Sequence, residues 1–385
     1  METGFIWPEE RVPSAAIRDW VASTFPPTDV HSVVGPTTVY RVNDWGVTAR
    51  FALLPAAQAD DSEDVVGTAS VVCKVGLTPL SASSPAIYHA LALCAPGSVP
   101  RLLASRSDAM PREMDGVPMA KPQTWLMFAP FSGRAVRSFR NVEPIVEMAK
   151  VMGRVQVAFA ALPERDKRDI PRAFVAELPA QLDTVLRDVR ETYAPFWREH
   201  RQRLVGEHGM DESVQERLAD ERTMEEYRAR VVAWVGELMR YRESDAWRDS
   251  IDHLDLHTNN AVVLDEGDAS GIKVLIYDWE EASVGCPFFS LANLLENARR
   301  LEPTPAAPSL EAQVRLAYLN VLPWGVRSER EEAFDLALKL APLRRLYETR
   351  QLFRSLGVST IQTAGGKPME EAVVVAGYLA DALTQ

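Results

Sequence analysis

After an opening helical segment, runs of apolar and β-branched residues make the first third of the chain rich in predicted strands. A helical pattern over residues 15–24 ends at two prolines. β-Branched runs then predict three strands of an antiparallel meander, at residues 37–42, 47–54 and 69–75. A short helical face at Ile87, Tyr88 and Leu91 and a further strand at residues 125–128 follow. The pattern predicts a small β-rich lobe over residues 1–130.

The period changes to that of amphipathic helices from about residue 141. Apolar residues then keep the helical spacing for several turns, and residues 171–247 are again helical and rich in Glu, Arg and Leu. Two short strands, at residues 261–264 and 273–277, flank a D-E-G-D-A-S-G stretch as the arms of a hairpin would. We therefore expect an α+β chain in which residues 131–385 form a large, mostly helical lobe.

Composition and charge exclude several classes of partner. A length of 385 residues exceeds what one core usually holds, and this agrees with two lobes. With 42 Lys and Arg against 54 Asp and Glu, the net charge of -12 argues against nucleic acid and anionic membrane as partners. The 3 cysteines have neither metal-site nor disulfide spacing, and we find no signal peptide or membrane span. We expect a cytoplasmic protein, with no sequence signal for its oligomeric state.

The strongest chemical pattern is H-L-D-L-H-T-N-N at residues 253–260, followed by I-Y-D-W-E around Asp278. Phosphoryl transfer needs a carboxylate against the attacking hydroxyl and oxygen ligands for the magnesium that neutralises the phosphates. Asp255 fits the first need, while Asn260 across one tight loop and Asp278 after the hairpin fit the second. A polar surface loop could contain the same residue types. Because apolar strands on both sides would bury this loop, and buried carboxylates need partners, the pattern favours phosphoryl transfer.

These motifs resemble those of the aminoglycoside phosphotransferase and choline kinase family, which shares the bilobal protein-kinase-like fold. The family shows H-G-D-x-H-x-x-N, then D-W-E or D-F-E after a strand, then G-D-P-x-x-D-L-A. The counterparts here are residues 253–260, 278–280 and 285–292, within a resemblance from about residue 39 to about residue 295. It implies ATP and Mg2+ as cofactors, Asp255 as catalytic base, and Asn260 and Asp278 as metal ligands. His253 is expected to brace the loop through hydrogen bonds.

Lys74 is the expected contact for the nucleotide phosphates. It ends the apolar run S-V-V-C-K-V-G, where its ammonium either extends to solvent or pairs with a phosphate. The family resemblance makes it the third-strand lysine that contacts the α- and β-phosphates.

Two further parts of the nucleotide site are weaker predictions. The phosphates could be covered by the turn at residues 34–38 or by the turn that contains Asn43 and Gly46, and we favour the second because it separates two strands by a hairpin length. Gly46 could equally be an ordinary hairpin glycine. Met127, Phe128 and Ala129 resemble the hinge whose backbone pairs with the adenine edge, although these residues could simply belong to a core strand.

Three positions depart from the family pattern. Ser84 or Pro85 replaces the helix glutamate that normally pairs with the lysine, so Lys74 would be oriented by another carboxylate, by the nucleotide alone, or not productively. Leu254 replaces the glycine of H-G-D and should alter loop packing more than chemistry. Ser290 replaces an aspartate that commonly braces the catalytic loop, and this change should loosen the loop.

These features predict an ATP- and magnesium-dependent kinase for a small-molecule hydroxyl, such as that of an antibiotic, a sugar or an amino alcohol. A nucleotide-binding pseudokinase with a regulatory role is the alternative, motivated by Ser84 and Ser290. A protein kinase is disfavoured, because the motif lacks an arginine before Asp255 and no D-F-G or A-P-E follows.

The acceptor site is expected between the catalytic loop and residues 171–247. The acidic run at residues 211–227, together with Glu280 and Glu281, would favour a cationic acceptor, although such a run is usually a solvated helix face. Aromatic residues of the same segment could stack on a ligand, although most should belong to the core: Tyr193, Phe196, Trp197, Tyr227, Trp234, Tyr241 and Trp247.

Overall fold

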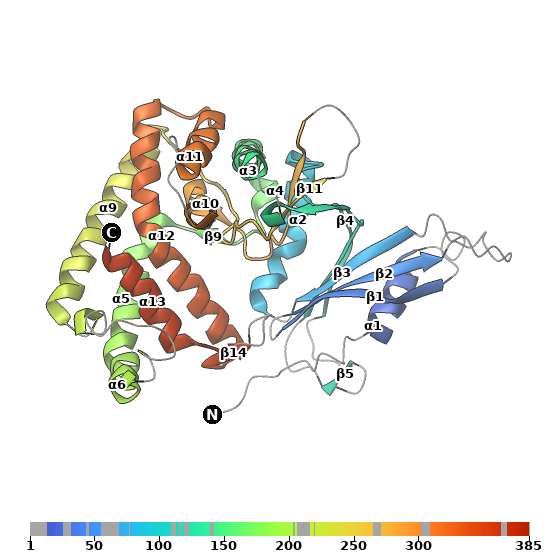
Figure 1. Cartoon of the computed structure of the whole chain (residues 1–385), viewed down its shortest axis with the longest axis horizontal. Coiled ribbons are helices and arrows are strands. Elements are labelled where there is room, and N and C mark those ends of the chain that lie inside the picture. Colours follow the sequence, from blue (N-terminus) through green and yellow to red (C-terminus); the bar gives the residue numbers. More distant parts are fainter. Residues whose placement is uncertain are drawn as a thin grey trace.

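The computed structural model has a β-rich lobe and a larger helical lobe side by side (Figure 1). The structure describes residues 14–25, 32–43, 46–54, 69–76, 78–108, 113–114, 117–118, 123–138, 142–202, 205, 216–218, 220–264, 271–301, 309–362 and 368–384. The antiparallel sheet and the mostly helical remainder confirm the predicted α+β class.

The N-terminal lobe is built on one five-stranded antiparallel sheet. Its strands in spatial order are β1 (Ser32–Asn43), β2 (Gly46–Leu54), β3 (Ala69–Gly76), β7 (Gln123–Phe128) and β4 (Leu102–Asp108). A separate two-stranded ribbon joins β5 (Glu113–Met114) to β6 (Val117–Pro118). The predicted strands are confirmed, except that β1 begins at Ser32 and includes the Gly35-Pro36 step that we placed in a turn. As an edge strand, β1 can include a proline and a shift of register between Val34 and Thr38.

One helix covers each face of this sheet. Because successive side chains of a strand point to opposite faces, Trp125 and Met127 of β7 pack with α1 (Ser14–Thr24). Leu126 and Phe128 point the other way and join the core that α2 (Ser84–Cys94) shares with the helical lobe. Helix α2 therefore lies between the sheet and the helical lobe (Figure 1).

The helical lobe is organised around α3 (Glu143–Ala160). Its other helices are α4 (Glu164–Lys167), α5 (Leu178–Asp188), a π-helical turn (Val189–Tyr193), α6 (Ala194–Glu199), α9 (Glu221–Glu243), α10 (Leu291–Leu301), α11 (Leu310–Val321), α12 (Arg327–Leu356) and α13 (Glu371–Thr384). Short 3-10 turns occur at Pro79–Ser83, Val136–Ser138, Val175–Glu177 and Pro287–Ser290. Gln156, buried in the middle of α3, donates to the carbonyls of Ile251 and Pro287 at 2.9 and 2.8 Å. These bonds connect the strand that leads into the predicted catalytic motif with the turn that contains Pro287.

Further small sheets lie outside the five-stranded sheet. One joins β10 (Ser250–Asp252), β13 (Ser283–Gly285) and β9 (Arg172–Ala173), a second joins β12 (Val274–Ile276), β11 (Ala261–Leu264) and β8 (Gly133–Ala135), and a third joins β14 (Thr360–Gln362) to β15 (Pro368–Glu370). β11 and β12 pair antiparallel, with Ala261 opposite Ile276, which confirms the predicted hairpin. The Tyr277 amide also donates to the Asn260 carbonyl at 2.9 Å, so the two ends of the hairpin stay together.

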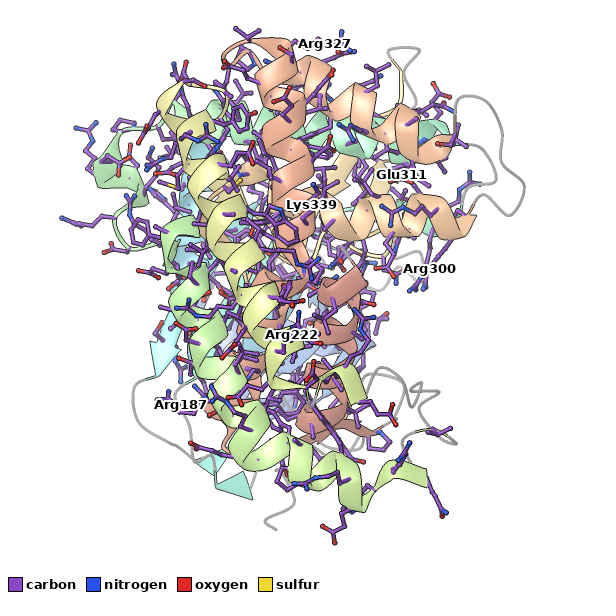
Figure 2. The ribbon with its side chains drawn as sticks, turned by 90° about the vertical axis from the view of Figure 1, so that its left-hand side faces the viewer. Arg187, Arg222, Arg300, Glu311, Arg327 and Lys339 are labelled. Carbon is purple, nitrogen blue, oxygen red and sulfur yellow. The ribbon has the colours of Figure 1, made fainter. Side chains whose placement is uncertain are left out.

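Charged side chains cover the outer surface of the helical lobe. Arg187 of α5 and Arg222 of α9 point into solvent (Figure 2). Arg222 pairs with Glu226 one turn later at 2.9 Å, so this part of the acidic run is a solvated helix face. Residues 211–215 of that run lie outside the described residues. Among the helices that the structure describes, none is long and apolar enough to cross a bilayer.

Candidate active site

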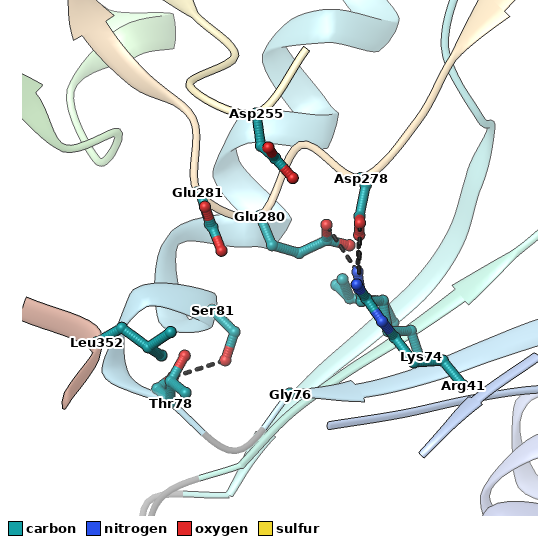
Figure 3. A pocket seen from close by; sticks show the side chains of 11 residues that line it. Arg41, Lys74, Gly76, Thr78, Ser81, Asp255, Asp278, Glu280, Glu281 and Leu352 are labelled. Carbon is teal, nitrogen blue, oxygen red and sulfur yellow. Dashed lines mark hydrogen bonds and ion pairs between the residues drawn. The ribbon is translucent and has the colours of Figure 1, made fainter. Parts of the chain in front are cut away.

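The loop between β10 and β11 carries the H-L-D-L-H-T-N-N motif. Asp252 ends β10 fully buried, and its Oδ1 accepts bonds from the Leu254 amide at 3.0 Å and the Ser290 hydroxyl at 2.8 Å. The Asp255 amide donates to the His253 carbonyl at 2.8 Å, which closes a tight turn. The turn directs the Asp255 carboxylate into the cleft between the lobes (Figure 3).

Four side chains surround the Asp255 carboxylate. Asn293 and Asn260 lie 3.1 and 3.4 Å away, His257 Nε2 lies 3.3 Å away and Arg345 Nη2 lies 3.6 Å away. Burial alone would raise the pKa of Asp255, but the hydrogen bond to His257 and the charge of Arg345 outweigh it and keep this pKa below its ordinary value. Asp255 is therefore ionised at neutral pH, as a base that receives a hydroxyl proton must be.

His253 is buried beneath this loop and joins it to the strand that leads to Asp278. Its Nε2 lies 3.0 Å from the Tyr277 carbonyl oxygen, so Nε2 carries the proton and donates. Burial lowers the pKa of His253, which keeps the ring neutral. The Trp279 ring packs on the imidazole with centroids 4.5 Å apart. His253 thus links the loop to the segment that carries Asp278, and its bracing role stays a prediction.

Asp278 lies where two cations from the N-terminal lobe meet the helical lobe. Its carboxylate contacts the Lys74 ammonium and accepts a bond from Arg41 Nη1 at 3.2 Å (Figure 3). Burial would raise the pKa of Asp278, but the charges of Lys74 and Arg41 outweigh it and hold this pKa well below its ordinary value. Lys74 Nζ also lies 2.8 Å from Glu280 Oε2, and these carboxylates keep the ammonium charged.

A cavity of about 110 Å³ joins the predicted phosphate-binding lysine, the predicted base and one predicted metal ligand. Its lining residues are Arg41, Lys74, Gly76, Thr78, Ser81, Leu126, Asp255, Asp278, Glu280, Glu281 and Leu352 (Figure 3). Gly76 ends β3 at its rim, and a Cβ there would lie 2.5 Å from Ser81, so the chain can approach this closely only with glycine. We name this space the phosphate cavity.

Other predicted nucleotide contacts do not line the phosphate cavity. Asn43 and Gly46 pair across the β1–β2 turn, whose tip at residues 44–45 lies outside the described residues. Met127 and Phe128 lie in β7 with strands on both sides, and the Ala129 amide donates to the Arg101 carbonyl at 2.9 Å. The adenine contact at this hinge stays a prediction.

A second cavity of about 150 Å³ opens on the other side of Asp255. It is lined by Leu254, Asp255, Glu281, Arg345, Glu348, Thr349, Leu352, Met369, Val374 and Tyr378. Its walls come from α12, β15 and α13 rather than from the segment 171–247 that we expected to form the acceptor site. We name it the helix-walled cavity.

Aromatic residues of the segment 171–247 pack in the core instead. Tyr193, Trp197, Tyr227 and Trp247 are all at most 6% exposed. The Tyr193 hydroxyl donates to Glu371 at 2.8 Å, and the Trp197 indole donates to the Ala372 carbonyl at 2.9 Å. These rings therefore hold the start of α13, which in turn lines the helix-walled cavity.

The three departures from the family pattern have different structural outcomes. Ser84 begins α2 fully buried, and Glu280 supplies the carboxylate to Lys74 in place of the helix glutamate. Ser290 does not loosen the loop as we expected, because its hydroxyl donates to Asp252 and accepts from the His253 amide at 2.9 Å. Leu254 has a left-handed backbone, with φ of +64°, and its side chain lines the helix-walled cavity.

Sequence reasoning missed four side chains that contact the predicted site residues: Arg41, Tyr88, Asn293 and Arg345. Asn293 follows the third family motif directly, and its polar side chain inside an apolar helix face was a usable signal. Arg345 lies in a long helix with many arginines, and nothing in its local sequence distinguishes it.

Comparisons with known proteins identify the family and the fold of the chain. The model of the phosphotransferase enzyme family matches residues 65–329. No curated protein matches the chain by sequence. Among solved structures, the GDP and kanamycin complex of APH(2")-IIia is 12% identical with a TM-score of 0.51, over 97% of this chain and 99% of that chain. A GDP complex of wild-type aminoglycoside 2'-phosphotransferase-IIIa is 12% identical with a TM-score of 0.50, over 95% and 98%.

A Plasmodium vivax ethanolamine kinase is 10% identical with a TM-score of 0.47, over 95% of this chain and 85% of that chain. The two aminoglycoside phosphotransferase structures confirm the bilobal protein-kinase-like fold. Since the family model covers well over half of the sequence, the chain belongs to the phosphotransferase enzyme family.

Proposed function

We propose that the protein transfers the γ-phosphate of ATP, in the presence of Mg2+, to a hydroxyl group of a small molecule. The observation that carries this proposal is the phosphate cavity itself, where Lys74, Asp255 and Asp278 face one space from three separate elements. A phosphoryl donor, its counter-ion and a hydroxyl need these three groups together.

The oxygen donors fit magnesium. Asp278 offers a carboxylate at the cavity wall, and Asn260 uses its amide nitrogen toward Asp255, which leaves its amide oxygen for a cation. The described residues contain no cluster of three or more His, Cys, Asp or Glu side chains suited to a metal. Nucleotide-bound magnesium needs one or two protein ligands, since phosphates and waters complete its shell. When bound, the ion would neutralise charge on the phosphates.

Asp255 would orient the acceptor hydroxyl and receive its proton. Its low pKa makes it a weak base, which suits a loose transition state in which the proton is transferred late. Asn293 and His257 hold the carboxylate from two sides, so it stays directed at the attacking oxygen.

The acceptor would bind in the helix-walled cavity, because Asp255 lines both cavities. Glu281 and Glu348 place carboxyl groups in the wall of this cavity, and Arg345 contributes positive charge beside Asp255. Since Glu348 also contacts the buried Arg344, Glu281 is the group that would pair with an acceptor ammonium, and it would then lose the proton that its raised pKa retains near neutral pH. A small amino alcohol or aminosugar fits this charge arrangement, and the acceptor hydroxyl would then face Asp255.

The test compares Asp255→Asn with Asp249→Asn, an acidic control that pairs with Arg242 at the lobe surface. Purified proteins are incubated with Mg-ATP or Mg-GTP and a panel of hydroxylated amines, sugars and antibiotics, and nucleoside diphosphate release is measured with and without each compound. We expect Asp255→Asn to lower kcat by at least about 100-fold, since positioned bases supply about 10²- to 10⁴-fold. Its Mg-ATP affinity by calorimetry should stay within about 3-fold of wild type, because a factor of 3 is below 1 kcal/mol.

A wild-type protein that binds Mg-ATP but neither hydrolyses it nor phosphorylates any compound would favour the pseudokinase. A protein that binds no nucleotide would overturn both functions. The pseudokinase rests on Ser84 and Ser290. In the structure Glu280 contacts Lys74 although α2 offers no carboxylate, and Ser290 itself donates to Asp252 in the loop.

A further inference from the structure

The carboxylate that holds Lys74 comes from the segment after β12 and not from α2. Glu280 Oε2 lies 2.8 Å from Lys74 Nζ. Helix α2, which carries the lysine partner in the family pattern, contains no acidic residue between its ends at Ser84 and Cys94. The Ser84 hydroxyl is buried and has no hydrogen-bond partner among the described residues, so it cannot substitute for a carboxylate.

Tyr88 connects α2 to this carboxylate. It follows Ser84 by one helical turn, on the same face of the helix. Its hydroxyl donates to Glu280 Oε1 at 3.2 Å and accepts from the Trp279 amide at 3.3 Å. The ring is 2% exposed and packs edge-on against Phe128 with centroids 4.8 Å apart. Each carboxylate oxygen of Glu280 therefore has its own partner, Tyr88 on one side and Lys74 on the other.

Glu280 and Asp278 differ in whether they can stay in contact with Lys74 once a cation binds. Both contact the ammonium in this structure. The proposed function requires Asp278 to turn to a cation, and its hold on Lys74 would then weaken, because one carboxylate cannot give its full charge to two partners. Glu280 is only 9% exposed, and a buried carboxylate must keep a cationic partner to offset its lost hydration. We therefore expect Glu280 to stay on Lys74 when Asp278 turns to the cation.

We propose that Glu280 is the positioning residue that keeps Lys74 directed at the nucleotide phosphates, and that Tyr88 carries the contribution of α2 in place of a helix glutamate. This inference rests on the proposed function. It divides the D-W-E motif between two tasks, with Asp278 facing the cation and Glu280 facing the lysine.

A double-mutant cycle tests the inference. Lys74→Ala, Glu280→Gln and the double variant are compared with wild type for kcat/KM with respect to ATP and for Mg-ATP affinity by calorimetry. We expect Glu280→Gln to lower kcat/KM by about 10- to 100-fold, as loss of supporting contacts does in other sites. The double variant should fall no more than about 3-fold below Lys74→Ala, because Glu280 acts through the lysine. Fully additive losses would overturn the inference.

Two further measurements exclude other roles. If Glu280 instead holds the metal, excess Mg2+ will restore the activity of Glu280→Gln, and such recovery would overturn the inference. Tyr88→Phe should lower kcat/KM by about 3- to 10-fold, the loss of one hydrogen bond to a charged group. Tyr227→Phe loses an equally buried hydroxyl of α9 that lines neither cavity, and it should leave kcat/KM unchanged. If Tyr88→Phe also has no effect, the α2 link is wrong.

These measurements distinguish an error in this inference from an error in the proposed function. An active wild type with an additive cycle removes only the role of Glu280. A wild type without magnesium-dependent nucleotide binding removes the proposed function as well. Should Glu280→Gln fail to fold, as judged by its thermal transition, Tyr88→Phe and Lys74→Ala form the cycle instead, and additivity between them overturns the inference.

Discussion

Replacing Leu254 with glycine and with alanine separates the strain of its backbone from the packing of its side chain. Leu254 has φ of +64°, a left-handed conformation that side chains other than glycine rarely adopt. Its side chain is nevertheless 6% exposed and lines the helix-walled cavity. The chain therefore holds a leucine where the family pattern has a glycine, at a cost in backbone energy that its packing offsets.

The left-handed backbone costs a leucine about 1 to 2 kcal/mol relative to glycine. Elsewhere, glycine is less stable than alanine by about 0.5 to 1 kcal/mol, because it loses more backbone entropy on folding. Both variants at position 254 lose the buried leucine side chain, so the packing term cancels between them. Leu256 is the matched control, since it is fully buried in the same loop and does not have a positive φ.

Urea unfolding of the four variants measures the difference. At position 256 alanine should be more stable than glycine by about 0.5 to 1 kcal/mol. At position 254 alanine should lose this advantage or be less stable than glycine. The difference in unfolding free energy between the glycine and alanine variants should therefore change by about 1 to 2 kcal/mol from position 256 to position 254. An equal glycine-to-alanine difference at both positions would show that the backbone of Leu254 is not strained. Both Leu254 variants also enlarge the cavity, and they should change the KM of the acceptor while the KM of ATP stays nearly constant.

The remaining predictions concern the metal ligand, the loop brace and the cleft carboxylate. Asp278→Asn should weaken Mg-ATP binding by at least about 100-fold in calorimetry, because a charged ligand in a buried site is lost, and an unchanged affinity would remove Asp278 from the cation site. Ser290→Ala should lower the free energy of unfolding by about 1 to 3 kcal/mol, since buried Asp252 loses a hydrogen-bond donor. Ser290→Asp should lower it further, because it places a second carboxylate beside Asp252, and a Ser290→Asp variant more stable than wild type would contradict this role of Ser290. Part of the Glu281 side chain reaches solvent, but the surrounding protein removes enough of its hydration to raise its pKa to about 8, and the charges of Asp255, Asp278 and Glu348 act in the same direction, with Lys74 opposing. The folded state therefore holds an extra proton on Glu281 between its ordinary pKa and about pH 8, and stability falls across this window, so the Tm advantage of Glu281→Gln should grow from pH 5 to pH 8.5; a constant difference would contradict it.

Local patterns predicted the parts of the fold that local interactions determine. The hairpin of β11 and β12 was evident because turn-forming residues separate two apolar runs, and pairing of neighbours in sequence needs no distant contact. The start of β1 was missed for a physical reason. Pro36 lacks an amide hydrogen and usually ends a strand, but β1 is the edge of the sheet and pairs with β2 alone, so the missing donor costs little there.

The candidate site also has parts that local sequence predicts and parts that depend on distant packing. Asp255 and Asn260 lie five residues apart in one loop, so their spacing alone implied that they act together. Arg345 and Tyr378 reach the same cleft from α12 and α13, and their approach depends on how long helices pack. The aromatic residues of the segment 171–247 could not locate the acceptor site for that reason. Spacing indicates which side of a helix a ring occupies, but it does not say whether that side meets a ligand or another helix.

Ser84 and Ser290 depart from the family pattern, but the interactions expected from that pattern are still present in the structure. At the loop brace, the carboxylate is Asp252 and the hydroxyl is Ser290, so a hydrogen bond between a carboxylate and its neighbour persists although the pattern loses its aspartate. At the lysine, the carboxylate moves from α2 to Glu280. In both places the interaction is kept and the position that supplies it changes. Because the energy of a buried charge depends on the presence of a partner and not on the chain segment that provides it, such exchanges are open to any chain whose packing brings another polar group within reach. A missing pattern residue is therefore weak grounds for inferring lost catalysis until the atoms around the lysine and the loop are examined.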